Sequence, residues 1–361
     1  MISESPVRSG RPAVASPTLM QLSMPTPAEI STARRRGQRK AVLIAVLAVT
    51  AYWGLVFAAG SVVVRVVCAA VLIVAVVATA TSIMHDANHG ALTRSGRLNR
   101  VLGYSADLLG ASSWMWRFKH NYLHHGNTNI ETVDSDLSQA PFARLAPGQP
   151  WRPWHRYQYL YMWFLYGFLA IKWLMYGDFS NLIHHRVGGQ PLRHRPGRRD
   201  LSLILAGKLA HVTWALAIPL LLHPWWAVAA FYLVCSWVVG FTLAVIFQLA
   251  HCVDSAQFAG PDEPRRGDDF ELHQLRTTVD VDCRVPLLRW MMGGLDHQIE
   301  HHLAPRLPHT IYPLVAQRLR ELCADRHITY RLHPNVRSAV RAHARWLKQM
   351  GQPPTSSPGW S

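Results

Sequence analysis

Four long blocks of apolar residues alternate with polar and basic segments along this chain. The blocks cover residues 41–59, 62–84, 201–222 and 224–250, and they lack the three-to-four-residue periodicity of a helix with one wet face. At about 1.5 Å per residue, a helix of about nineteen residues reaches about 28 Å, which is enough to cross the hydrocarbon core of a bilayer. The pattern therefore predicts an all-α integral membrane protein with four transmembrane helices.

The breaks between the blocks, and the charges beside them, predict how these helices are arranged. A Gly-Ser pair at 60–61 separates the first two blocks and a His-Pro pair at 223–224 separates the last two, so we expect two hairpins. Basic clusters at 34–40 and 193–199 precede the two hairpins. Because basic residues gather on the cytoplasmic side of membrane spans, we expect both termini and the segment between the hairpins to be cytoplasmic.

A fifth apolar segment, residues 157–177, is also long enough to cross a bilayer. It is unusually rich in Tyr and Trp, contains Lys172 and lies between two basic loops. If it crossed, the histidine motifs before and after it would face opposite sides of the membrane. We therefore expect an interfacial helix whose aromatic rings lie at headgroup depth.

Both ends of the chain are expected to be polar. Residues 1–33 are rich in Ser, Pro, Thr and Ala, which predicts a disordered tail rather than a cleavable signal peptide. Residues 309–350 have the pattern of an Arg-rich helical segment, and we expect 331–361 to form a cytoplasmic C-terminal tail. The membrane domain would then cover residues 34–330.

Composition excludes several other classes of protein. Half of the residues are hydrophobic and only 16% are charged, which argues against a disordered chain. The net charge of +16 would suit nucleic-acid binding, but the arginines flank apolar blocks, so we expect membrane lipid and no nucleic acid as a partner. Five scattered cysteines without a CxxC pair predict neither a disulfide framework nor a thiolate zinc site.

The histidines are concentrated in clusters that the predicted topology brings to one side of the membrane. They occur in HDANH (85–89), HNYLHH (120–125) and QIEHH (298–302), and His251 ends the fourth apolar block. Histidines at positions i and i+4 share one face of a helix and can bind one ion, whereas an adjacent histidine, turned by about 100°, can address a second. Eight histidines and a glutamine exceed what one ion accepts, so two metal ions are predicted.

The donor set favours iron. Neutral imidazole suits Fe, Zn, Cu and Ni, but zinc takes only about four ligands, whereas iron takes more and is redox-active. Two irons beside a bilayer indicate oxygen chemistry on an apolar substrate. The chain contains no GxSxG or Walker A motif that would indicate another reaction.

Histidines outside these clusters are expected to be solvated or structural. His184, His185 and His194 lack helical partners, and His211 lies inside the third apolar block, where we expect a hydrogen bond between helices. His297 is ambiguous, since it stands four residues before His301 just as Gln298 stands four residues before His302. Helical geometry alone does not choose between them.

The three motifs resemble the histidine boxes of the integral-membrane fatty acid desaturases, which have the forms HxxxH, HxxxHH and [HQ]xxHH. The glutamine of the third box, with Gly-Gly-Leu at 293–295 and Leu-Ala-Pro at 303–305, is similar to the front-end acyl-lipid branch. Asn129 and Asp136 match the family's TN…D pattern. The resemblance covers roughly residues 40–330.

The resemblance implies four transmembrane helices in two hairpins, with an interfacial helix and a cytoplasmic cap that holds a non-haem di-iron site. It implies an oxidoreductase that introduces a double bond into a fatty acyl chain, carried on lipid, CoA or a carrier protein, with O2 and two electrons. We expect this site on the cytoplasmic side of a bacterial cell membrane. The implied metal ligands, of which the histidines are also the implied catalytic residues, are His85, His89, His120, His124, His125, His251, Gln298, His301 and His302.

The electron donor is expected to be a separate protein. Eukaryotic front-end desaturases usually carry a fused cytochrome b5 domain with an HPGG motif, and the His-Pro pairs at 223–224 and 333–334 lack the glycines. We therefore expect a ferredoxin with its reductase, or a cytochrome-type donor.

Further roles and two alternatives stay open. Asp134, Asp136 and Glu300 are candidate partners for the ligand imidazoles, and Trp114 and Trp116 are candidates to line an acyl tunnel. A fatty acyl hydroxylase or epoxidase would use the same scaffold. A membrane metal-binding or transport protein is the alternative from another class, although it predicts ligands at mid-membrane depth rather than at the ends of spans.

Overall fold

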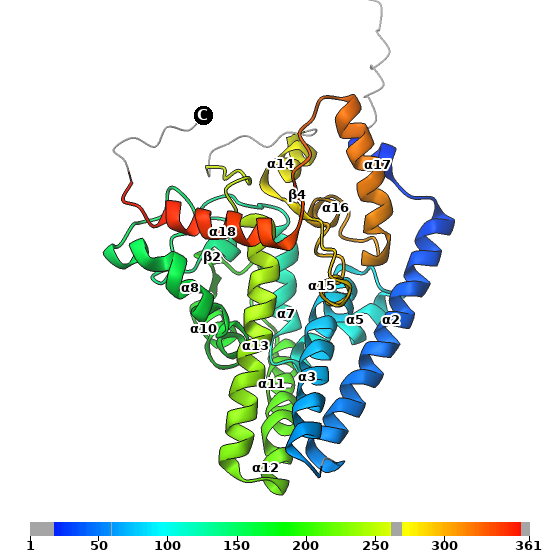
Figure 1. The fold of residues 1–361 in the computed structure, drawn as a ribbon, viewed down its shortest axis with the longest axis vertical. Helices are drawn as coiled ribbons and strands as arrows, with labels where there is room; N and C mark the ends of the chain where they lie inside the picture. The colour runs from blue at the N-terminus through cyan, green and yellow to red at the C-terminus, as the bar shows by residue number, and fades with distance from the viewer. Residues whose placement is uncertain (1–17, 59, 261–268, 355–361) are drawn as a thin grey trace, which may run out of the picture.

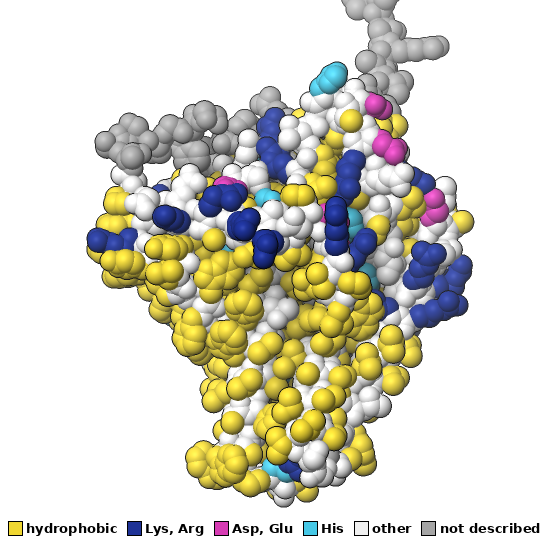
Figure 2. Space-filling model, in the orientation of Figure 1, with side chains coloured by type: hydrophobic (Ala, Val, Ile, Leu, Met, Phe, Trp, Pro, Cys, Tyr) yellow, Lys and Arg dark blue, Asp and Glu magenta, His cyan; other side chains and the backbone are white. Residues whose placement is uncertain are grey.

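The computed structural model describes residues 18–58, 60–260 and 269–354. Long helices stand side by side in a tapering bundle, and shorter helices form a cap over its wide end (Figure 1). The visible surface of the bundle is mainly hydrophobic, whereas Lys and Arg side chains gather mostly around the wide end (Figure 2). The polar and apolar parts of the chain therefore occupy different levels of the molecule.

Four helices are long and apolar enough to cross a membrane, namely Pro27–Ala58, Val62–His89, Arg198–Leu220 and Trp225–His251. Each overlaps one of the predicted apolar blocks, so the prediction of four helices that could cross a membrane is confirmed. The first is α2 (Pro27–Trp53) with a π-helical turn at Gly54–Ala58. The last is α13 (Trp225–His251), whose C-terminal end lies below the cap.

The other two spans are composite. The second consists of α3 (Val62–Ala78), a π-helical turn (Thr79–Met84) and α4 (His85–His89). The third consists of α11 (Arg198–Val212), a π-helical turn (Thr213–Ala217) and α12 (Ile218–Leu222). The α3 helix packs against both α2 and α13, so segments far apart in the sequence meet along the bundle.

The N-terminal region is more ordered than its composition suggested. We expected a disordered tail over residues 1–33, but α1 (Leu19–Ser23) and the first turns of α2 form within that range. Thr18 and Thr26 cap these two helices, and each accepts a hydrogen bond from a backbone N–H three residues later. The expectation is therefore wrong for residues 18–33, and the earlier residues lie outside the described part of the chain.

Short helices connect the second span to the third. Their order is α5 (Gly96–Gly103), α6 (Ser105–Leu108), α7 (Ser113–Trp116), a π-helical turn (Arg117–His124), 3-10 turns (Ser135–Leu137 and Pro153–Tyr157), α8 (Gln158–Tyr166), α9 (Leu169–Lys172), a π-helical turn (Trp173–Gly177) and α10 (Asp178–His184). An antiparallel pair, β1 (Arg186–Val187) and β2 (Gln190–Pro191), follows.

The segment predicted as one interfacial helix, residues 157–177, is helical but broken. Its helices α8 and α9 are separated at Gly167 and Phe168. Both helices pack against α13, where a Cβ atom at Gly167 would overlap the Trp237 indole. The Trp237 indole occupies the space that a side chain would need, which explains the glycine. None of the membrane-spanning candidates among the described residues includes this segment.

The cap is built from the C-terminal third of the chain. It contains α14 (Asp269–Thr277), β3 (Asp280–Val281), α15 (Pro286–Met292), α16 (Gln298–Leu303), a 3-10 turn (His309–Ile311), α17 (Tyr312–Asp325), β4 (Leu332–His333) and α18 (Val336–Met350). β3 and β4 pair in parallel.

The C-terminal segment is part of the fold rather than a tail. We expected residues 331–361 to form a separate cytoplasmic tail, but α18 packs against α8 and α13. Its Trp346 and Leu347 side chains are buried in a core with Met162 and Tyr166 of α8. The described part of this segment, up to residue 354, therefore belongs to the cap.

One apolar core joins the bundle to the cap at the level of the histidine motifs. It includes Val77, Met84, Trp116, Val239 and Met292, which come from the second and fourth spans, from α7 and from α15. Burial of each such side chain contributes about 1.5–3 kcal/mol relative to exposure. This packing holds the ends of the spans in a fixed position below the cap.

Candidate metal centre

The eight histidines predicted as ligands come together where the spans meet the cap. His85 and His89 lie on α4, His120 and His124 in the π-helical turn after α7, and His125 directly after it. His251 is the last residue of α13, and His301 and His302 lie on α16. Residues from four separate segments thus face one common space.

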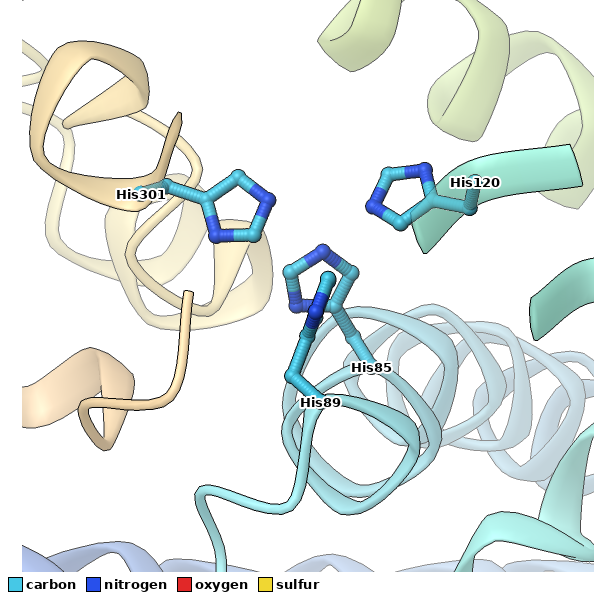
Figure 3. Close-up of side chains that lie close together, drawn as sticks. All are labelled: His85, His89, His120 and His301. Carbon is cyan, nitrogen blue, oxygen red and sulfur yellow. The ribbon is translucent and has the colours of Figure 1, made fainter. Parts of the chain in front are cut away.

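The first group of candidate ligands consists of His85, His89, His120 and His301. One ring nitrogen from each lies within 4.8 Å of those of the other three. The imidazoles of His85 and His301 approach most closely, with ring centroids 4.4 Å apart. Figure 3 shows the four rings converging from α4, from the π-helical turn and from α16.

The second group consists of His124, His251 and His302, whose ring nitrogens also lie within 4.8 Å of one another. His125 lies between the two groups, since its nitrogen is within the same distance of those of His301 and His302. The two adjacent histidines of α16 therefore face different groups, as expected from their angular separation on a helix. The arrangement offers nitrogen donors for two ions.

The second histidine motif departs from the expected α-helical pairing. We expected His120 and His124 to address one ion and His125 the other, but the first two contribute mainly to different groups. The reason is the π-helical turn, in which residues five apart come into register. His125 therefore lies directly beside His120, with 3.2 Å between their Nε2 atoms.

Several ring nitrogens in this cluster are buried and have no hydrogen-bond partner among the described residues. Buried polar atoms in native structures are nearly always satisfied, so this concentration of unpaired nitrogens fits a role as metal donors. The donors and their number fit two transition-metal ions. The orphaned atoms are Nδ1 and Nε2 of His85, Nε2 of His89, Nδ1 of His125, Nδ1 of His251, Nε2 of His301 and Nε2 of His302.

Two hydroxyl groups fix which nitrogen of the α16 histidines faces the cluster. Tyr312 donates its O–H to the Leu307 carbonyl, so its oxygen accepts a hydrogen bond from His301 Nδ1 at 3.3 Å. The Thr128 hydroxyl has carbonyl-type acceptors within 3.0 Å and accepts from His302 Nδ1 at 3.0 Å. Both imidazoles thus carry a proton on Nδ1 and present the Nε2 lone pair.

A carboxylate performs the same task for His124. Asp134, which is fully buried, accepts from His124 Nδ1 at 3.1 Å. Asp136 lies farther away, at 3.6 Å from the same nitrogen, and forms an ion pair with Lys119 at 2.9 Å. Of the three acidic residues predicted as imidazole partners, Asp134 therefore makes the direct contact.

Electrostatics favours the neutral form of most ligands outside the spans. Burial lowers the pKa of His120, His125, His301 and His302 well below the usual range, and the neighbouring imidazoles lower it further. The neutral imidazole is the form that binds a metal ion. His124 differs, because Asp134 outweighs the effect of burial and raises its pKa.

Gln298 is the first residue of α16, whereas His297 directly precedes the helix. His297 precedes the helix, with a non-helical φ of −116°, so the helical pairing with His301 does not apply to it. Its nitrogens face two carboxylates instead, at 3.6 Å from Asp280 and 3.7 Å from Asp296. The buried Gln298 side chain faces His251 and so approaches the second ligand group.

Glu300 does not contact a ligand imidazole, contrary to expectation. Its carboxyl group accepts a hydrogen bond from the Tyr330 hydroxyl at 2.8 Å and lies beside Asp280 and His297. Burial and the neighbouring Asp280 carboxylate raise the pKa of Glu300 well above its usual range. The helix turns this side chain away from the metal centre because His301 and His302 occupy the facing positions.

The structure adds contacts that the sequence did not reveal. Asp86, inside the first motif, accepts a hydrogen bond from His309 Nδ1 at 2.7 Å and so ties α4 to the cap. Its position in the HDANH motif was an available signal. Thr128 is the threonine of the TN…D pattern, which was also an available signal, whereas Tyr312 had none.

Three further histidines, His184, His194 and His211, lie outside the two histidine groups. His184 is exposed, and His194 packs edge-on against Trp114. His211 joins two parts of the bundle through the Leu108 carbonyl and the Tyr232 hydroxyl, at 3.0 and 3.1 Å. None of them belongs to the ligand groups found among the described residues.

Of two cavities in the described part of the chain, one reaches the histidine groups and the other does not. One, of about 870 Å³, is lined by His89 and His125 and by the candidate tunnel residue Trp114. The other, of about 150 Å³, lies between the spans and is lined mainly by apolar residues such as Val76 and Val239. Trp116, the other tunnel candidate, lines neither cavity and stacks on His120, with ring centroids 4.2 Å apart.

Comparison with known proteins gives a consistent result. The sequence profile of the fatty acid desaturase family matches residues 61–334. The chain is 34% identical over 271 residues to an sn-1 linoleoyl-lipid 6-desaturase of Arthrospira platensis, covering 74% of this chain and 73% of the relative. Identity to the Synechocystis sp. protein of the same name is 33% over 322 residues, with coverages of 86% and 87%. An acyl-lipid (8-3)-desaturase of Physcomitrium patens is 32% identical over 274 residues, which cover 75% of this chain and 57% of that relative.

Proposed function

The chain belongs to the fatty acid desaturase family, and we propose that it introduces a double bond into the acyl chain of a membrane lipid at a di-iron centre. The observation that carries this proposal is the pair of buried histidine groups with orphaned nitrogens. The hydrocarbon substrate has no group that a polar side chain could activate, so the oxidation requires a redox-active site of this kind.

We assign the nine predicted ligands to two iron sites. His85, His89, His120 and His301 would hold one ion, and His125 lies between the two sites. The other ion would be held by His124, His251, His302 and the Gln298 side chain. Two irons bound by these residues would supply, with O2 and two electrons, the oxidising power needed to remove two hydrogens from adjacent methylene groups.

The protein's own residues orient the ligands and keep water away. Asp134, Thr128 and Tyr312 fix the imidazoles of His124, His302 and His301, which keeps the donor atoms in place without the metal. Trp116 and the apolar core around it form a dry wall against His85, His89 and His120. This wall favours a hydrocarbon chain beside the metal centre over a polar substrate.

We infer a membrane orientation with the cap on the cytoplasmic side. The apolar surface of the bundle, and the Lys and Arg side chains gathered around its wide end, support four spans in two hairpins (Figure 2). The broken segment 157–177 would then lie at headgroup depth, where its exposed Tyr157, Phe164 and Tyr176 meet lipid. The metal centre would face the cytoplasm, where a separate protein delivers the electrons.

An acyl lipid is the favoured form of the substrate over acyl-CoA or an acyl-carrier protein. The names of the relatives from Arthrospira platensis and Physcomitrium patens specify a lipid-linked acyl chain. A membrane protein whose catalytic groups lie at the ends of its spans also receives lipid without extraction from the bilayer. This substrate choice is a proposal for the present chain.

Expression in a host that lacks desaturases tests the proposal. Fatty acid methyl esters from cells carrying the intact chain should contain a new double bond, whereas cells carrying His301→Ala should not. The position of the double bond identifies the regiochemistry. Hydroxy or epoxy products in place of the alkene would contradict desaturation and support the alternative reaction on the same scaffold.

A further inference from the structure

The larger cavity beside the metal centre is strongly basic. Its volume is about 870 Å³, and it lies between α4, α5, α7, the start of α11 and the loop after α16. Five arginines from five separate segments line it, namely Arg94, Arg100, Arg117, Arg199 and Arg306. These positions range from residue 94 to residue 306, so the fold brings distant parts of the chain together at this cavity.

These arginines have no carboxylate partner of their own. Arg117 donates to Asn88 Oδ1 at 3.0 Å, and Arg94 donates to Ser31 Oγ at 3.3 Å, so both contacts are with neutral groups. None of the ion pairs within 4.0 Å among the described residues includes any of the five arginines. The guanidinium groups therefore keep donors available for an anion.

The charge inside the cavity is unbalanced. Two carboxylates, Asp107 and Asp200, line it beside the five arginines, which leaves an excess of three positive charges. Asp107 accepts from the Ser113 backbone N–H at 3.3 Å, and Asp200 accepts from the Gly197 backbone N–H at 3.0 Å. Like charges in one cavity repel, so a bound anion would remove an electrostatic cost.

Arginine is also the side chain best suited to one class of anion. Its planar fork of N–H donors matches the oxygens of a phosphate group and can bind two of them at once. The bias of basic residues toward the cytoplasmic side of a membrane does not require that they line one cavity. Their arrangement here favours a phosphate-binding site.

The same cavity reaches the metal centre and the apolar bundle. His89 and His125, both predicted metal ligands, form part of its wall. Leu203 and Ile204 of α11 line it as well and provide an apolar side. A molecule with its phosphate among the arginines could therefore place an attached acyl chain beside the histidines.

We propose that this cavity binds the phosphate of the acyl carrier, which is either a glycerophospholipid or an acyl-CoA, and thereby positions the acyl chain at the metal centre. The inference rests on the proposed desaturase function for the identity of the acyl group, but phosphate binding itself does not depend on turnover. The cavity selects phosphorylated carriers over neutral acyl lipids.

Equilibrium binding to the purified full-length protein in detergent tests this inference. The probes are radiolabelled dioctanoyl phosphatidylglycerol, coenzyme A and dioctanoylglycerol. The first two contain phosphate, and dioctanoylglycerol lacks it. The variants are Arg100→Gln and Arg117→Gln. The matched control is Arg97→Gln, since Arg97 lies exposed on α5 like Arg100 but does not line the cavity.

We expect the intact protein to bind a phosphorylated probe, and each cavity variant to weaken that binding about tenfold, the usual scale for a lost charge-assisted contact. Arg97→Gln should bind like the intact protein, and dioctanoylglycerol binding should not depend on any arginine. Tighter binding of phosphatidylglycerol identifies a phospholipid carrier, and tighter binding of coenzyme A identifies an acyl-CoA. Circular dichroism and iron content identify a variant that fails to fold.

Two results would overturn the inference. One is equal binding of dioctanoylglycerol and phosphatidylglycerol, and the other is the same loss of affinity in Arg97→Gln as in the cavity variants. The two proposals also fail separately. Arginine-dependent phosphate binding without any new double bond in the expression host would refute desaturation while leaving the phosphate site standing.

Discussion

Replacing Asp134 by Asn should remove the hydrogen bond that orients the His124 imidazole, while the side chain at position 134 keeps nearly the same size. The Asp134 carboxylate is buried and accepts three hydrogen bonds: from His124 Nδ1 at 3.1 Å, and from the backbone N–H groups of Asn129 and Asp136 at 2.9 Å each. All three partners are donors. An asparagine offers one oxygen and directs its NH2 group at the remaining donors.

The expected loss of metal affinity follows from the number of donors that Asp134 accepts from. A buried donor without a partner costs about 1–3 kcal/mol, and Asp134→Asn leaves at least one such donor at the metal centre. Loss of a hydrogen-bond partner behind a metal-binding histidine typically lowers metal affinity or activity by about 10–100-fold. We therefore predict weaker iron binding in the group of His124, His251 and His302, and a loss of desaturation of that order.

The assay is iron per chain after dialysis against a chelator, together with product yield in the expression host. Asp282→Asn is the matched control, because Asp282 is an exposed carboxylate paired with the exposed Arg284. The control should retain both irons and full activity. If Asp134→Asn also retains both after the chelator treatment, the role given to Asp134 in orienting His124 is wrong.

Other predictions test the ligand set and the topology. His301→Ala should lose activity and bound iron, whereas His184→Ala, at an exposed position, should lose neither. Gln298→Ala should lose most activity while His297→Phe keeps its iron and substantial activity, and the reverse pattern in metal analysis would shift the ligand assignment by one residue. A reporter fused after Gly188 should behave as cytoplasmic, like one fused after the second histidine motif, and opposite behaviour of the two would mean that residues 157–177 span the membrane.

The four spans were predictable because the bilayer imposes a simple requirement. Each span needs a continuous apolar stretch of sufficient length, and that signal needs no knowledge of the fold. The clustering of the histidines was predictable because histidines four residues apart share one face of a helix, as His85 and His89 do. The position of His125 beside His120, with His124 in the other group, was not predictable, because a π-helical turn has no clear signature in this sequence.

The N-terminal helices illustrate order that composition does not reveal. Residues rich in Ser, Pro and Thr favour disorder locally, but here tertiary partners stabilise them. The Leu19 backbone N–H donates to Glu271 at 2.8 Å, and Glu29 pairs with Arg318 at 2.7 Å. Both partners come from the distant C-terminal cap, so the local sequence could not indicate the interaction.

The partners of the ligand imidazoles were predictable only in part. Asp134 lies close to the second motif in sequence, and a carboxylate there is a recognisable signal. Tyr312 and Glu300 show the limit, because the role of Tyr312 depends on how the chain leaves α16 and that of Glu300 on partners outside that helix. That path brings the Tyr312 hydroxyl to His301, while Glu300 turns toward Asp280 and Tyr330.

The number and identity of metal ions in the active protein test the central claim most directly. Protein purified without oxygen and retaining desaturase activity should contain about two irons per chain, held mainly by nitrogen, because the two histidine groups offer separate donor sets. Elemental analysis of that sample, matched to its activity, is the decisive measurement. Two irons per chain would agree with the account, and a fully active protein with a single zinc ion would contradict it.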